Sequence, residues 1–82
     1  MNALQNVAVM AARRGGAILI RHIPKLEKLN VEKKGHNDFV SDADRAAEAA
    51  VIEVIKNHYP DHAILAEESG QQGDSDTVWI ID

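Results

Sequence analysis

Two short apolar runs in the last third of the chain are each followed directly by acidic residues. Residues 63–66 (Ala-Ile-Leu-Ala) lead into Glu67 and Glu68, and residues 77–81 (Thr-Val-Trp-Ile-Ile) lead into Asp82. Runs of this length and composition are typical of buried strands. If the two strands are neighbours in one sheet, the acids emerge at the same edge, where a hard divalent cation would find oxygen ligands. Because the chain ends on the last of these acids, we expect this cation site to be incomplete.

The length and composition limit the class of protein. A chain of 82 residues can form one small core, and without cysteine it has neither disulfides nor a thiolate metal site. The net charge of −4 argues against general nucleic-acid binding and fits either an acidic pocket or an ordinary surface. No apolar run reaches the roughly 20 residues of a membrane span, and no secretory signal is evident. We therefore expect a cytoplasmic protein without a membrane partner.

The beginning of the chain has the pattern of a helix. Apolar residues from Leu4 to Leu19 recur on one face, and Pro24 is expected to end the segment. Gly15 and Gly16 inside this helix would each cost about 1 kcal/mol relative to alanine. We interpret the pair as a place where another element packs closely.

A second helix is predicted from the apolar stripe over residues 43–55, and residues 59–60 (Tyr-Pro) are expected to end it. Ser41 and Asp44 have the spacing of a capping box at its start. Acids in a first helical turn also complement the helix dipole, so Asp38, Asp42 and Asp44 have a purely structural explanation.

The segments around the two helices contain turn-forming residues. Residues 29–34 and 38–40 flank a Gly-His-Asn turn and suggest two short strands joined as a hairpin. Residues 70–76 are rich in Gly, Gln, Asp and Ser and are interpreted as a solvated loop. Surface or packing roles are favoured for His22, His36, His58 and His62 over metal ligation.

Four motifs, taken in order, resemble the inositol monophosphatase family, particularly its bacterial members. They are residues 34–44 (Lys-Gly-His-Asn-Asp-Phe-Val-Ser-Asp-Ala-Asp), 59–62 (Tyr-Pro-Asp-His), 67–70 (Glu-Glu-Ser-Gly) and 79–82 (Trp-Ile-Ile-Asp). The last two are the most specific, and the final one resembles the opening of a signature that continues Pro-Leu-Asp-Gly-Thr or similar. Ser41 stands where family members often carry threonine, which keeps the hydroxyl group.

The resemblance implies an α+β fold, in which residues 1–82 are the incomplete N-terminal part of one phosphatase domain. This part of a layered αβαβα sandwich would hold two helices and the first strands of an antiparallel sheet. The implied activity is that of a magnesium-dependent phosphomonoesterase, which hydrolyses inositol 1-phosphate or a similar small phosphate ester with metal-activated water. Sensitivity to lithium and a homodimer are also implied.

The resemblance also implies roles for individual acids. Glu67 would ligate Mg²⁺, contact the substrate and help to position the attacking water, Asp82 would bridge two Mg²⁺ ions, and Glu68 would lie in or beside the metal shell. Asp44 would pair with the threonine of the signature to orient the nucleophile. Further ligands would lie beyond Asp82, so residues 1–82 alone are expected to bind Mg²⁺ poorly and to be inactive.

Two other functions remain open. The apolar helix faces could serve an interaction module, since some bacterial relatives are thought to act in transcription and rRNA synthesis. Alternatively, the chain could belong to a related phosphatase that acts on a sugar bisphosphate such as fructose 1,6-bisphosphate, on a nucleotide 3′-phosphate or on NADP. The residues that select the substrate are not among these motifs.

Overall fold

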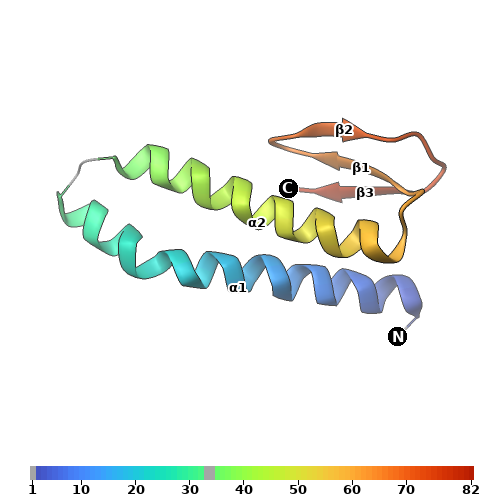
Figure 1. Ribbon diagram of the computed structural model, residues 1–82, viewed down its shortest axis with the longest axis horizontal. Helices are drawn as coiled ribbons and strands as arrows, with labels where there is room; N and C mark the ends of the chain where they lie inside the picture. Colours follow the sequence, from blue (N-terminus) through green and yellow to red (C-terminus); the bar gives the residue numbers. More distant parts are fainter. Residues whose placement is uncertain (1, 33–34) are drawn as a thin grey trace.

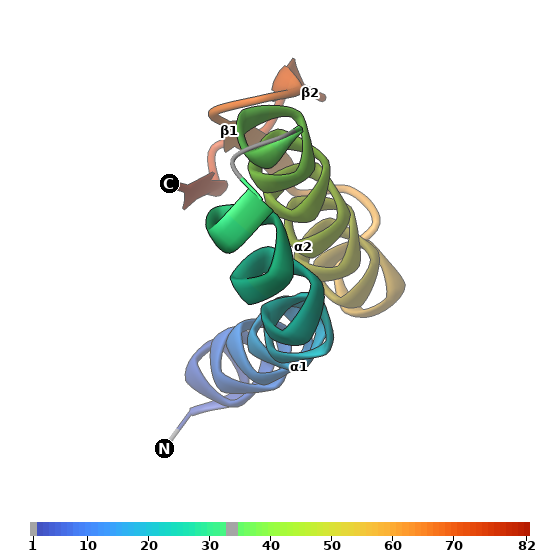
Figure 2. The ribbon, with the colours of Figure 1, turned by 90° about the vertical axis from the view of Figure 1, so that its left-hand side faces the viewer.

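The computed structural model describes residues 2–32 and 35–82 and contains two long helices followed by a three-stranded sheet. Helix α2 lies between helix α1 and the strands (Figure 1), and the end view agrees (Figure 2). The expected α+β class is confirmed. No helix of the described residues is long and apolar enough to cross a membrane. The elements are α1 (Ala3–Glu32), α2 (His36–His58), β1 (Ala63–Ala66), β2 (Gly70–Gln72) and β3 (Val78–Ile81).

Helix α1 continues through Pro24, so the expectation that proline ends it is wrong. An internal proline removes the hydrogen bond that would reach the carbonyl of Ile20, at about 3 kcal/mol or more. Contacts with α2 on both sides of Pro24 offset part of this loss. The ring centroid of His22 lies 5.3 Å from that of Phe39, and the Lys25 ammonium lies 5.2 Å from the same ring.

The hairpin expected over residues 29–34 and 38–40 is also wrong. Residues 29–32 belong to α1 and residues 38–40 belong to α2, while residues 33–34 lie outside the described part of the chain. The turn itself is present at Gly35, whose φ of 73° lies in the left-handed region that favours glycine. It joins two helices because the apolar spacing of both segments continues up to it.

The start of α2 differs from the expected capping box. The helix begins at His36, so Ser41 and Asp44 lie inside it, and Gly35 is the N-cap residue. Within the described residues no side chain makes a capping hydrogen bond there. Asp44 therefore has no capping role, and its place in the fold needs another explanation. The predicted end of the helix is confirmed, with Tyr59 as the C-cap residue.

The sheet contains both strands predicted from the apolar runs and one more. Its order is β2–β1–β3, with β1 antiparallel to β2 and parallel to β3, so the sheet is mixed rather than antiparallel. Strand β2 lies in the segment 70–76 that was expected to be a loop, of which residues 73–76 remain irregular. The parallel pairing places Ala66 beside Ile81, and the acids that follow β1 and β3 therefore leave the sheet at the same edge.

One face of the sheet packs on the helices. Ile64 and Ala66 of β1 are buried together with Ala11 of α1 and Ile55 of α2. Because side chains alternate along a strand, the neighbouring positions face the other way. Ile80 on that outer face is 73% exposed. The core thus fixes the sheet against both helices and leaves its other face open.

Gly15 permits the close approach of the two helices. A Cβ atom at Gly15 would lie 2.7 Å from Cγ2 of Val51, whereas one at Gly16 would have no heavy atom within 4 Å. The close packing expected of the glycine pair is therefore confirmed at Gly15 and not at Gly16. This contact holds α1 against α2 beside the pocket described next.

Candidate functional site

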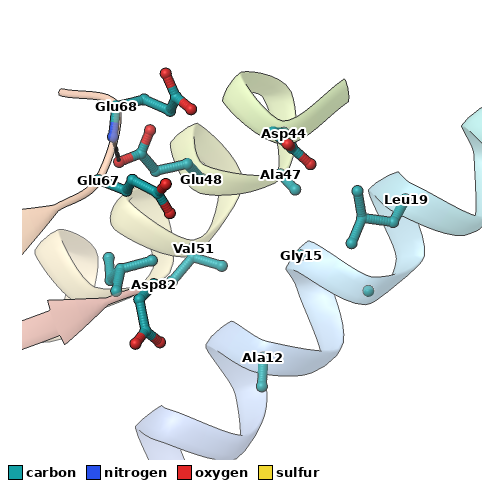
Figure 3. A pocket seen from close by; sticks show the side chains of 12 residues that line it. Ala12, Gly15, Leu19, Asp44, Ala47, Glu48, Val51, Glu67, Glu68 and Asp82 are labelled. Carbon is teal, nitrogen blue, oxygen red and sulfur yellow. Dashed lines mark hydrogen bonds between the residues drawn. The ribbon is translucent and has the colours of Figure 1, made fainter. Parts of the chain in front are cut away.

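A pocket of about 360 Å³ opens between the two helices and the carboxyl ends of β1 and β3 (Figure 3). Acidic residues from α2 and from the segments after β1 and β3 line one side. Small and apolar residues of α1 line the other. The acids are Asp44, Glu48, Glu67, Glu68 and Asp82, and the α1 residues are Ala12, Gly15, Gly16 and Leu19.

Strand pairing positions the acids that follow β1 and β3. The backbone N–H of Glu67 donates a hydrogen bond of 3.3 Å to the carbonyl of Ile81, which extends the contact between the strands by one step. Glu67 and Asp82 therefore lie next to each other at the sheet edge, and Figure 3 shows both side chains at the pocket. The prediction that these acids emerge together is confirmed.

Helix α2 supplies two further acids to the same pocket. Asp44 and Glu48 are one helical turn apart and so lie on the same face. This face also carries Ala47 and Val51, which line the pocket between the helices. The structure thus places Asp44 in the same pocket as the acids of the sheet edge. The reason is its position on the helix face rather than a helix cap.

Glu48 was not predicted to be part of the site. Its Oε1 atom accepts hydrogen bonds from the backbone N–H of Glu68 (3.2 Å) and from the backbone N–H and hydroxyl of Ser69 (both 3.4 Å). Figure 3 shows the bond to Glu68. The only sequence signal was the helical spacing of Glu48 from Asp44, and that spacing does not reveal a bond to a segment 20 residues away.

The charge of the pocket favours a cation. None of its described lining residues is basic, and five are acidic. Carboxylate oxygens are the ligands that Mg²⁺ and Ca²⁺ prefer, so the donor set fits a hard divalent cation in kind. The number of ligands is too small, because no three His, Asp or Glu side chains of the described residues are grouped closely enough to hold a metal ion.

The described histidine side chains have structural roles away from this pocket, as expected. The rings of His22 and His58 hydrogen-bond to backbone carbonyls one turn earlier in their helices, at 2.7 and 2.9 Å. His62 accepts a 3.0 Å hydrogen bond from the indole N–H of Trp79 and stacks on the ring of Tyr59. Trp79 packs against the buried core, in agreement with the interpretation that it is a core residue.

Comparison with known proteins places these observations in a family. The model of the inositol monophosphatase family matches residues 1–82. The Nus factor SuhB of Haemophilus influenzae is 43% identical over 84 residues, covering 100% of this chain and 32% of that protein. The same factor from Xylella fastidiosa is 47% identical over 77 residues, which cover 94% of this chain and 28% of that protein. The same factor from Escherichia coli K12 is 42% identical over 84 residues, which cover 100% of this chain and 32% of that protein. The chain thus spans about a third of the length of these curated relatives.

Proposed function

Because this chain belongs to the inositol monophosphatase family, we propose that its acids form part of the metal site of a magnesium-dependent phosphomonoesterase. The substrate would be inositol 1-phosphate or a similar small phosphate ester. The observation that carries the proposal is the convergence of Asp44, Glu67 and Asp82, from three separate segments, on one pocket. A metal site that takes oxygen ligands from several segments needs such acids in one pocket.

The residues have distinct roles in this proposal. Glu67 and Asp82 would hold Mg²⁺ with Glu68 beside them, and Glu67 would also contact the substrate and help to position the attacking water. Asp44 would accept a hydrogen bond from the group that orients this water. When bound, Mg²⁺ neutralises phosphate oxygens and lowers the pKa of its water. Since the described acids do not group in threes, the site needs ligands besides these.

Replacement of Glu67 in the full-length protein tests the proposal. Glu67→Gln should keep the melting temperature and lose most of the Mg²⁺-dependent phosphate release from inositol 1-phosphate, because an amide is a poor substitute for a charged ligand. Glu53→Gln is the matched control, since Glu53 is an exposed acid of α2 that does not line the pocket. Near-wild-type turnover of Glu67→Gln with unchanged Mg²⁺ dependence would refute the proposal.

The substrate and the assembly belong to the same proposal. A panel of inositol 1-phosphate, fructose 1,6-bisphosphate, a nucleotide 3′-phosphate and NADP, compared by kcat/KM, would identify the preferred ester. Inhibition by lithium and a homodimer in light scattering are expected, as is a cytoplasmic location. A preference for a bisphosphate or a nucleotide would keep the metal chemistry and change the substrate class.

A second candidate function is suggested by the relatives, each of which is named a Nus factor. We propose as the alternative that the chain takes part in a bacterial transcription complex through its surface. Ile20 and Ile23 of α1 are 67% and 44% exposed and offer an apolar contact. In a pull-down with transcription factors of rRNA synthesis, Glu67→Gln should then bind like the wild type, whereas Ile20→Asp should bind less. Equal capture of wild type and Ile20→Asp would exclude this surface.

A further inference from the structure

We propose that Glu48 is a positioning residue, which holds the turn that carries Glu67 and Glu68 in the geometry needed to bind the metal. The inference rests on the proposed function and deepens it. Glu48 lies on α2, whereas the turn follows β1, so the contact joins two segments of the pocket.

The turn between β1 and β2 is held from outside. It contains residues 67–69, because Ala66 and Gly70 are the last paired residues on either side. The first N–H of the turn, that of Glu67, donates to the carbonyl of Ile81 on β3. The next two N–H groups donate to Oε1 of Glu48, as does the hydroxyl of Ser69. Each backbone donor of the acidic turn is therefore bound by another element of the pocket.

An acid at residue 48 is unfavourable unless these donors are present. It lies one turn from Asp44 on the same helix face, and like charges at this spacing destabilise a helix. It also adds negative charge to a pocket that already holds Glu67, Glu68 and Asp82. Hydrogen bonds to an ionised acceptor are stronger than neutral ones, and the three bonds of 3.2–3.4 Å to Glu48 act against this repulsion. The carboxylate thus ties the turn to the helix at the point where the proposed ligands begin.

Residues that hydrogen-bond to the segment carrying a metal ligand orient that ligand without binding the metal themselves. Loss of such a partner typically costs roughly 10- to 100-fold in metal affinity or activity. A glutamine at residue 48 still offers an acceptor oxygen at the same distance from the helix. Alanine offers none, and aspartate is shorter by one methylene group. The positioning role therefore predicts that Glu48→Gln retains metal binding, while Glu48→Ala and Glu48→Asp lose it.

The test uses the full-length protein and two readouts besides activity. Amide hydrogen exchange without metal should be at least about tenfold faster at residues 68 and 69 in Glu48→Ala, because both donors lose their acceptor. In calorimetric titration with MgCl₂ the dissociation constant should rise by roughly 10- to 100-fold in Glu48→Ala and Glu48→Asp. Glu48→Gln and the control Glu53→Ala should stay close to the wild type in both measurements. Circular dichroism of each variant checks that the helices are intact.

The outcomes separate this inference from the proposed function. Wild-type exchange at residues 68 and 69 in Glu48→Ala would overturn the hold on the turn. Faster exchange with unchanged Mg²⁺ affinity would overturn the positioning role. A loss in Glu48→Gln as large as in Glu48→Ala would overturn it as well, because the charge itself would then be the contribution. A wild-type protein that binds no Mg²⁺ would instead refute the proposed function, and the metal part of this inference with it.

Discussion

Substitution of the two neighbouring glycines of α1 by alanine should have opposite effects on stability. Both residues are inside a long helix, so alanine at either position should gain about 1 kcal/mol from helix propensity. Their surroundings differ. A Cβ atom at Gly16 would meet no heavy atom within 4 Å, whereas at Gly15 it would lie 2.7 Å from Cγ2 of Val51.

The contact with Val51 determines how much Gly15→Ala destabilises the protein. Valine is stiff at χ1, so the Val51 methyl group cannot swing away, and an extra methyl group in a filled space typically costs about 1–3 kcal/mol. For Gly15→Ala the gain in propensity offsets part of this cost and leaves a net loss of about 1 kcal/mol in the free energy of unfolding. Gly16→Ala should instead raise that free energy by about 0.5–1 kcal/mol.

Urea unfolding of the full-length protein, followed by circular dichroism at a helix band, measures both values. The variant Val51→Ala provides the double-mutant cycle: in that background Gly15→Ala should stabilise the protein, because the methyl group it would strike is absent. If Gly15→Ala stabilises the wild type as much as Gly16→Ala does, α1 and α2 are not in the close contact described here.

Two side chains, Asp44 and Trp79, can be tested by single substitutions. Asp44→Asn should change the free energy of unfolding by no more than about 0.5 kcal/mol, because Asp44 is exposed and caps no helix. The same variant should lower phosphate release by orders of magnitude. An activity loss that only follows a lower melting temperature would refute the catalytic role. Trp79→Phe removes the hydrogen bond to His62 and should lower the free energy of unfolding by about 0.5–1.5 kcal/mol beyond the lost packing. Urea unfolding of His62→Ala, alone and combined with Trp79→Phe, tests this coupling. If His62→Ala destabilises both backgrounds equally, the two rings are not coupled.

The strands were predictable because their pattern is local. The apolar runs at residues 63–66 and 77–81 are each bounded by polar or acidic residues, and both are strands with almost the predicted limits. Strand β2 was not predictable from composition, because its Gly-Gln-Gln sequence is polar and forms a strand only by pairing with β1. Its register is set by the turn that precedes it.

The middle of the chain was mispredicted because tertiary contacts outweigh local signals there. Pro24 is a strong helix breaker in isolation, yet α1 continues through it beside Phe39 of α2. The turn was recognised correctly at Gly35, but His36 and Asn37 belong to α2, because a turn residue does not reveal whether strands or helices flank it. Ser41 and Asp44 matched a capping pattern by chance, since their helix begins earlier, at His36.

The pocket was partly predictable. The acids after the two apolar runs follow from strand pairing alone, whereas Asp44 was included through the family resemblance. Glu48 was missed because it acts through the backbone of residues 68 and 69, and no side-chain motif marks such a contact. Residues that bind backbone groups of a distant segment become visible only when the fold is known.

In the proposed function, acids from three segments share one cation site. Manganese, a paramagnetic divalent cation that also prefers oxygen ligands, can locate such a site in the ¹⁵N-labelled full-length protein. Substoichiometric Mn²⁺ should selectively broaden the amide resonances of Asp44, Glu67, Glu68 and Asp82, and excess Mg²⁺ should reverse the effect. Broadening that is centred instead on the loop acids Asp74 and Asp76, or that spreads over the surface without preference, would show that these acids do not share a cation site.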